Sequence, residues 1–219
     1  MKKIVVLYHA DCPDGFGGAW AAWKKFSKRA DYIPAKHQVP PQEKLKDKEI
    51  YLVDFTYFGA DLKRLVSKNK KVVIIDHHIT AKPELKNASE NFFALNRSGA
   101  GLAWRYFHRS KKVPMLIKYV EDQDLWNFKM PKAREIMAAV NLKPQNFNIW
   151  NKIATELEQK RGLKKYALKG ATVSEYENKT IADLMKKLEP AIFHGYRAGV
   201  INSPILQSEI GHAIYSSGF

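Results

Sequence analysis

Residues 71–78 read KVVIIDHH and decide the fold that we expect for this chain. The first five residues form a mostly β-branched apolar run, which is typical of a strand buried on both faces of a parallel sheet. The run leads directly into Asp76, His77 and His78, three side chains that can bind a metal ion. Because open α/β sheets bind ligands beyond the carboxyl ends of their strands, this stretch predicts a ligand site at one sheet edge.

Two other predicted strands end in the same kinds of side chain. Residues 4–8 (IVVLY) run into His9 and a polar loop, and residues 50–53 (IYLV) run into Asp54. If the three strands are parallel neighbours, their carboxylates and imidazoles meet at one edge of the sheet. Oxygen ligands with a few imidazoles suit one or two divalent cations.

The order of the expected elements indicates an α/β fold with a doubly wound, mainly parallel sheet. Strands at 4–8, 50–54 and 71–75 alternate with helices at about 17–28 and 60–68. This β-α-β-α-β order is typical of parallel sheets that carry helices on both faces.

Three parts are expected along the chain. Residues 1–148 form the sheet domain, residues 149–190 a mostly helical linker, and residues 191–219 a small, incomplete α/β region. Within the linker, Gly162 and Gly170 are expected to interrupt the helix, because glycine is a poor helix former.

The composition describes a basic chain with enough apolar residues for a core. Of 219 residues, 45% are hydrophobic, and 37 lysines and arginines against 22 acidic residues give a net charge of +15. Scattered lysines are often only a solvated surface, but with the site residues they favour a polyanionic partner such as nucleic acid, a nucleotide or polyphosphate. The single cysteine fits a reducing compartment. The lack of a signal peptide and of a long apolar run predicts a cytoplasmic protein without membrane contact.

The loop after the first strand carries three candidate metal ligands, His9, Asp11 and Asp14. Taken alone, they could equally be a helix cap and a surface histidine. Asp54 follows a central strand, where it could bridge two cations, and two-metal phosphoryl chemistry needs these at roughly 3.5–4 Å from each other. Cys12 lies in the same loop but is a weaker candidate, because the ligands around it are hard.

The side chains of residues 76–78 cannot all point the same way, because successive side chains alternate along an extended chain. One histidine is therefore expected to bind metal while the other faces substrate, and Asp76 either binds metal or supports a ligand histidine. A later acidic segment, Glu121–Asp124, follows an apolar helix. Asp122 or Asp124 would supply the last carboxylate of a second metal, and the sequence leaves both open.

Residues 97–101 (RSGAG) open another predicted helix. Free backbone amides at a helix N-terminus, together with Arg97, would suit a phosphate. Arg97, Ser98 and Gly99 are therefore candidate substrate-binding residues. The alternative is a plain helix start with Ser98 as its N-cap. Trp104, Trp126 and Phe128 could stack on a base, although core packing is the commoner use of such aromatic side chains.

Taken in order, these segments resemble the motifs of the DHH phosphoesterase superfamily. That superfamily includes RecJ-type exonucleases, oligoribonucleases that also act on phosphoadenosine phosphate, family II pyrophosphatases and exopolyphosphatases. Members usually carry a second, substrate-gripping domain called DHHA1, and residues 165–219 are similar to the start of one, without its glycine-rich GGGH motif. The matching segments, within residues 1–130, are His9–Gly15 (HADCPDG), Asp54, Asp76–His78 and Glu121–Asp124.

The resemblance implies a centre of two Mn²⁺ ions, for which Mg²⁺ or Co²⁺ could substitute. His9 and Asp11 would hold one ion, Asp14 and His77 the other, and Asp54 would bridge the pair. In this chain Asp11 and Asp14 are three positions apart, whereas the commonest form of the motif has two. The implied ligands are His9, Asp11, Asp14, Asp54, His77 and one of Asp122 and Asp124.

The resemblance also implies a catalytic set. His78 would contact the scissile phosphate, Asp76 would support the histidines, and Arg97 would help to stabilise negative charge. The expected activity is Mn²⁺-dependent hydrolysis of phosphate esters in nucleotides or short single-stranded oligonucleotides, by a hydroxide held between the two cations. One alternative is a phosphoanhydride hydrolase acting on polyphosphate or pyrophosphate, and another is a nucleic-acid-binding module without activity. The oligomeric state stays open, with a homodimer as one alternative.

Overall fold

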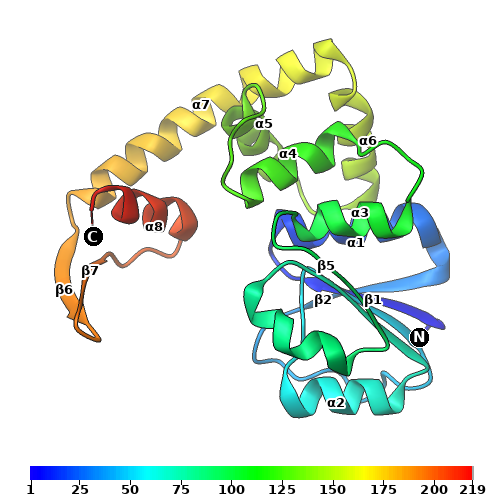
Figure 1. The fold of residues 1–219 in the computed structure, drawn as a ribbon. Helices are drawn as coiled ribbons and strands as arrows, with labels where there is room; N and C mark the ends of the chain where they lie inside the picture. Colours follow the sequence, from blue (N-terminus) through cyan, green and yellow to red (C-terminus); the bar gives the residue numbers. More distant parts are fainter. Residues whose placement is uncertain (219) are drawn as a thin grey trace.

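The structure, a computed structural model in which residues 1–218 are described, contains a five-stranded parallel sheet. Its order is β2-β1-β3-β4-β5, and every neighbouring pair is parallel. This arrangement, with helices on both faces, confirms the expected α/β doubly wound fold (Figure 1). The strands are β1 (Ile4–His9), β2 (Ala30–Ala35), β3 (Glu49–Val53), β4 (Lys71–Asp76) and β5 (Glu90–Phe93).

Each face of the sheet has its own apolar core. Helices α1 (Pro13–Phe26) and α3 (Gly99–Phe107) cover one face, onto which β3 directs Tyr51 and Val53. Helix α2 (Gly59–Lys68) covers the other face, together with a 3₁₀ segment that follows β4. Burial on both faces explains why the central strands are continuous apolar runs rather than alternating ones.

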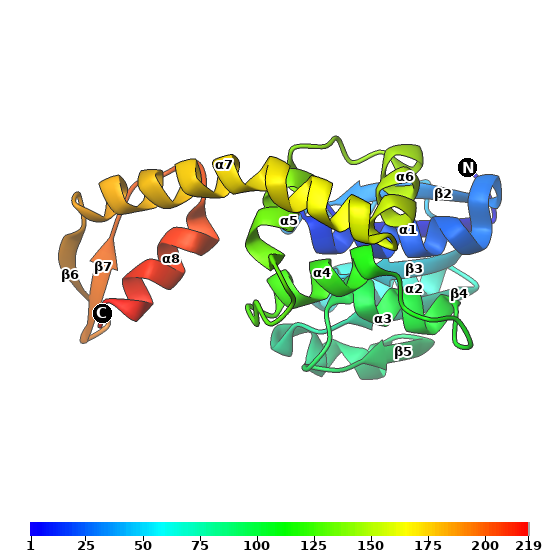
Figure 2. The same ribbon diagram turned by 90° about the horizontal axis from the view of Figure 1, so that it is seen from above.

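Four further helices lie over α1 and α3, as Figures 1 and 2 show. They are α4 (Met115–Asp124), α5 (Ala133–Asn141), α6 (Phe147–Leu157) and α7 (Lys160–Met185). Trp150 of α6 and Tyr166 of α7 belong to the same core as α1 and α3. The segment 149–190 is helical as expected, but its first part therefore packs on the sheet domain. Only the second half of α7 leads away from it.

The expected helix breaks at Gly162 and Gly170 are wrong, because α7 runs through both residues. A Cβ at Gly170 would overlap the carbonyl oxygen of Glu135, and one at Gly162 would overlap that of Glu156. These glycines permit a close approach of backbones where α7 crosses α5 and follows α6. Contact between helices therefore outweighs the poor helix propensity of glycine here.

Two other boundaries differ from the expected ones, and both move site residues onto helices. Helix α1 begins at Pro13, four positions before the expected start, because proline suits the first position of a helix. Asp14 therefore lies in its first turn. Helix α4 continues to Asp124, so the acidic segment 121–124 is helical rather than a loop.

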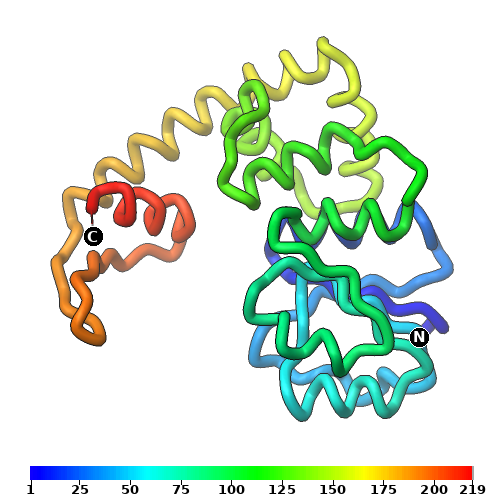
Figure 3. Tube along the Cα trace, in the orientation of Figure 1, coloured from blue at the N-terminus to red at the C-terminus, as the bar shows by residue number. Residues whose placement is uncertain are grey.

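The C-terminal residues form a small unit at the far end of α7, which can be followed in the trace of Figure 3. Strands β6 (Glu189–Phe193) and β7 (Tyr196–Val200) form an antiparallel hairpin, and α8 (Gln207–Ser216) returns beside α7. Within residues 1–218, no helix combines the length and the apolar character that crossing a membrane requires.

We predict that Gly170→Ala destabilises the protein by about 1–3 kcal/mol, because the added methyl group overpacks the α5–α7 contact. Gly211→Ala is the matched control, since Gly211 lies inside α8 and a Cβ there meets nothing within 4 Å. The control is expected to be neutral or stabilising by up to about 1 kcal/mol. Urea unfolding of both variants measures the difference, and equal stabilities would contradict the packing role of Gly170.

Candidate metal centre and substrate cleft

Parallel pairing aligns the carboxyl ends of three neighbouring strands. β3 lies between β1 and β4, and Val53 pairs with Tyr8 on one side and Ile75 on the other. The residues that follow, His9, Asp54 and the segment 76–78, therefore meet at one edge of the sheet. This is the convergence that the sequence predicts.

Asp54 is the centre of this cluster. Its side chain is 2% exposed, and its backbone is in the left-handed region at φ 54°, a conformation that aspartate tolerates better than most residues. One carboxylate oxygen, Oδ2, lies 3.5 Å from His9 Nδ1. The other, Oδ1, lies 3.2 Å from His77 Nε2 and 3.8 Å from His78 Nδ1. Asp54 thus contacts histidines from both neighbouring strands.

Two further carboxylates approach the cluster from helices. His77 Nε2 lies 3.8 Å from Asp14 Oδ2, in the first turn of α1, and 3.6 Å from Asp124 Oδ2, in the last turn of α4. The geometry distinguishes the two alternatives at 122 and 124, because two residues two positions apart on a helix face different directions. Asp124 faces the cluster, whereas Asp122 accepts hydrogen bonds from the backbone amides of Lys129 and Met130.

Several buried polar atoms of the cluster lack a hydrogen-bond partner. Within residues 1–218, Asp54 Oδ1, His77 Nε2 and Asp124 Oδ2 are buried and make no hydrogen bond. Buried polar groups are normally satisfied, so such a concentration needs an explanation. A divalent cation would supply it, because each of these atoms is a metal ligand when deprotonated.

The ligand atoms form three overlapping groups, and within each group they lie within 4.8 Å of one another. Asp54 belongs to two of the groups and His77 to two, so neighbouring cations could share Asp54. The residues present therefore fit a centre of two divalent ions, although the groups do not identify the metal. The groups are His9, Cys12 and Asp54; Asp54, His77 and His78; and Asp14, His77 and Asp124.

Asp76 supports the histidines rather than joining any of these groups. Its Oδ1 accepts hydrogen bonds from the backbone amides of His77 and His78 and lies 2.8 Å from His78 Nδ1. Its Oδ2 accepts a hydrogen bond from the hydroxyl group of Thr56 at 2.6 Å. These contacts fix the turn after β4 and the orientation of the His78 ring, as partners of metal-site histidines commonly do.

The ionisation of the cluster follows from burial and from these neighbours. Burial raises the pKa of Asp14 well above its usual range and that of Asp124 to about 6, and the nearby Asp54 charge adds to both shifts. Burial opposes ionisation of Asp54 too, but the imidazoles of His77 and His9 hold its pKa at about 2. Contact with Asp76 raises the pKa of His78 to about 9. Asp54 is therefore more readily ionised than Asp14 or Asp124, and its charge lies between the rings of His77 and His9.

Asp11 lies outside the cluster in this structure. Its side chain is 78% exposed and forms an ion pair with Lys36 at 2.8 Å, and its backbone is in the left-handed region. Cys12, by contrast, is partly buried, with its Sγ 3.7 Å from Asp54 Oδ2. Burial, together with the Asp54 charge, raises the pKa of the Cys12 thiol. The loop therefore directs His9 and Cys12 toward Asp54, and Asp11 toward solvent.

The backbone amides that open α3 are not free for a phosphate, contrary to expectation. Asp14 accepts hydrogen bonds from the amides of Gly99 and Ala100 at 2.6 and 3.0 Å. The Ser98 hydroxyl oxygen caps the helix by accepting from the Gly101 amide, so the alternative of a plain helix start holds for this residue. Arg97 is partly exposed and contacts Glu121 at 3.2 Å.

A cleft of about 390 Å³ adjoins the cluster. Cys12, Asp14 and Asp124 are among its lining residues, as are Trp126 and His212 of α8, whose ring centroids are 5.1 Å apart. Neither His212 nor Thr56 could be expected at the site from the sequence. The sequence marks these two residues only as polar, because their places at the site depend on contacts between distant segments. The remaining lining residues are Pro13, Val120, Gln123, Asn141, Ser208 and Glu209.

Comparisons with known proteins place the chain by its fold rather than by an activity. No profile of a known protein family matches it. It is 29% identical over 231 aligned residues to an uncharacterized protein of Acanthamoeba polyphaga mimivirus, covering 96% of this chain and 54% of that protein. The chain thus spans about half the length of this relative. A crystal structure of an uncharacterized protein from Helicobacter pylori has a similar fold, with a TM-score of 0.58 and 12% identity over 100% of this chain and 80% of that one.

We predict that Asp124→Asn weakens Mn²⁺ binding by at least about tenfold while the protein stays as stable as the wild type or becomes more stable. It removes a buried charge from a group of carboxylates, and with it a metal ligand. Asp122→Asn is the matched control. It should leave Mn²⁺ binding unchanged but cost about 1–3 kcal/mol, because an amide cannot accept both backbone hydrogen bonds. Mn²⁺ titration followed by electron paramagnetic resonance, with urea unfolding, separates the two effects, and the reverse pattern would contradict this assignment.

Proposed function

We propose that the protein is a two-metal phosphohydrolase that cleaves phosphate esters of nucleotides or short oligonucleotides. The observation that carries the proposal is the unsatisfied cluster around Asp54, in which buried carboxylates and imidazoles converge at the carboxyl edge of a parallel sheet. An arrangement in which one aspartate contacts two groups of ligands suits a pair of cations that act on one phosphate.

In this proposal each residue has a task that its position supports. His9 and Asp54 would hold one cation, and Asp14, His77 and Asp124 would hold the other, with Asp54 available to both. Two bound cations would lower the pKa of a water molecule and neutralise charge on the phosphate oxygens. Asp76 keeps the half-exposed His78 ring oriented at the border of the cluster, where it would contact the phosphate and stabilise developing negative charge.

The cleft favours a substrate that carries a flat ring. Trp126 and His212 line it together with Asp14 and Asp124 of the cluster, and aromatic faces bind bases by stacking. An inorganic phosphate chain would make no use of such a surface. A net charge of +15 raises the local concentration of any polyanion. Arg97 contacts Glu121 through Nη1 and is 44% exposed, so other N–H groups of its guanidinium could contact a bound phosphate. We expect the reaction to take place in the cytoplasm.

We predict that Asp54→Asn lowers turnover at least about a hundredfold, because it removes the carboxylate that contacts His9 on one side and His77 on the other. Asp61→Asn is the matched control, since Asp61 is a partly exposed residue of α2 that pairs with Arg64. The assay measures product release from a 5′-labelled short RNA, from phosphoadenosine phosphate and from polyphosphate, each with and without Mn²⁺. Release from polyphosphate alone would favour a phosphoanhydride hydrolase. No release by protein that binds Mn²⁺ would contradict the proposed activity and favour a binding module.

We predict that Trp126→Ala lowers kcat/KM for the RNA substrate roughly 5- to 150-fold, which is the loss expected when one base loses its stacking contact. Trp126→Phe keeps a ring in the cleft and should restore most of the loss. Hydrolysis of a phosphate ester without any ring, such as glycerol 2-phosphate followed by release of inorganic phosphate, provides the comparison and should change little in either variant. An equal loss with both kinds of substrate would contradict a stacking role.

A further inference from the structure

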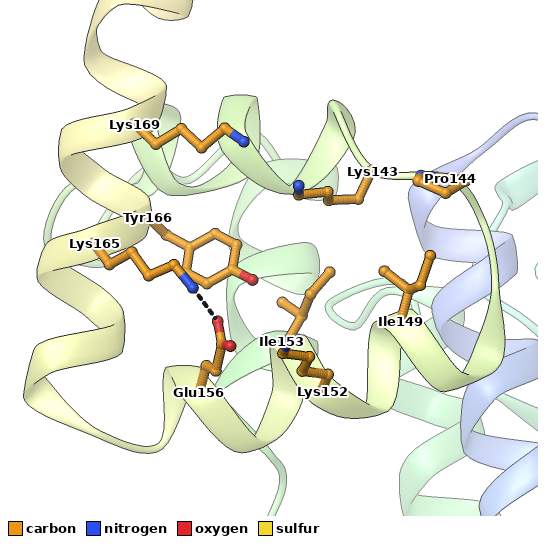
Figure 4. Close-up of a pocket in the computed structure, with 9 residues that line it drawn as sticks. All are labelled: Lys143, Pro144, Ile149, Lys152, Ile153, Glu156, Lys165, Tyr166 and Lys169. Atoms are coloured by element: carbon orange, nitrogen blue, oxygen red, sulfur yellow. Dashed lines mark hydrogen bonds and ion pairs between the residues drawn. The ribbon is translucent and has the colours of Figure 1, made fainter.

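A second hollow lies between the loop after α5, helix α6 and the first half of α7. It has a volume of about 320 Å³ and shares no lining residue with the cleft beside the metal cluster. Figure 4 shows the side chains that line it, which come from all three segments. This volume lies within the range of pockets that bind small molecules, about 300–1,000 Å³.

Lysine side chains dominate its rim. Lys143, Lys152, Lys165 and Lys169 line the pocket, against Glu156 as the single acidic residue among its lining side chains. Glu156 pairs with Lys165 at 2.9 Å. Within residues 1–218, the other three lysines have no carboxylate within 4.0 Å. The rim therefore carries an excess of positive charge.

Two of these lysines face each other. Figure 4 shows the amino groups of Lys143 and Lys169 directed toward one another across the hollow. The ammonium group of Lys169 lowers the pKa of Lys143, as expected for like charges held close together. Two like charges directed into one hollow repel each other, and a bound anion would offset that repulsion through charge-assisted hydrogen bonds.

The floor of the same pocket is apolar. Ile153 is 2% exposed and Tyr166 is 5% exposed, and Pro144 and Ile149 complete the apolar lining. An apolar floor under a cationic rim suits a ligand with two parts, a flat apolar ring and a phosphate group. The pocket contains no cluster of carboxylates or histidines among its lining residues, so it offers binding rather than catalysis.

We propose that this pocket is a binding site for a nucleotide, whose phosphates contact Lys143, Lys152 and Lys169 and whose ring lies on the apolar floor. A single nucleotide is favoured over a long strand because the hollow is a compact pocket. The proposal stands on its own contacts and does not depend on the activity proposed for the metal cluster.

The test is titration calorimetry of the full chain with ATP in the presence of EDTA, which removes divalent cations. We expect saturable binding that weakens as salt concentration rises. Lys143→Glu combined with Lys169→Glu should lower the affinity at least about tenfold. The control combines Lys63→Glu with Lys86→Glu, two exposed lysines away from the pocket with the same change in net charge, and should stay within about twofold of the wild type.

Two results would overturn the proposal. If the pocket variant binds ATP as well as the wild type, or if the control loses as much affinity, the site is not this pocket. If inorganic tripolyphosphate binds as tightly as ATP, the floor does not contribute and the ligand is not a nucleotide. Lys143→Gln with Lys169→Gln replaces the charge-reversal pair if that pair fails to fold, and it should lower affinity in the same direction.

Discussion

Everything at the candidate site depends on the parallel pairing of β3 between β1 and β4. The register sets Val53 beside both Tyr8 and Ile75, so the three chains leave the sheet at the same level. The left-handed backbone at Asp54 then turns its carboxylate between His9 and His77. Gly99 has no side chain where α3 meets Asp54, and a Cβ there would overlap it. A shift of β3 by one residue would reverse its two faces and remove Asp54 from both neighbours.

Burying three carboxylates near one another is costly, and the fold offsets this cost in part. Asp14 has the best compensation, because the amides at the N-terminus of α3 donate to both its oxygens and the helix dipole favours negative charge there. Asp54 has imidazoles on both sides. Asp124 has the least compensation for its burial, since its Oδ2 accepts no hydrogen bond within the described part of the chain. Such an uncompensated arrangement is typical of functional rather than structural clusters.

The sheet could be predicted from sequence because its signal is local. The apolar runs of β1, β3 and β4 and the polar residues after them are contiguous, and known rules of strand order place their ends together. The choice between Asp122 and Asp124 could not be made, because it depends on how far α4 continues. The helix break expected at Gly170 is wrong, because this glycine is needed for close contact with the backbone of Glu135 on another helix. His212 was missed for the same kind of reason, since more than eighty residues separate it from Trp126, as their numbers show.

The parallel topology also has a consequence for the order in which the chain folds. Ile4 pairs with Glu49, and Glu49 with Lys71, so each central pairing closes a long loop before its contacts stabilise it. The end of α4 must then bring Asp124 toward Asp14 and Asp54 against the repulsion of like charges. We therefore expect this docking to be among the last steps. The complete cluster exists only in the native state, and any ligand that needs all its members would stabilise that state by mass action.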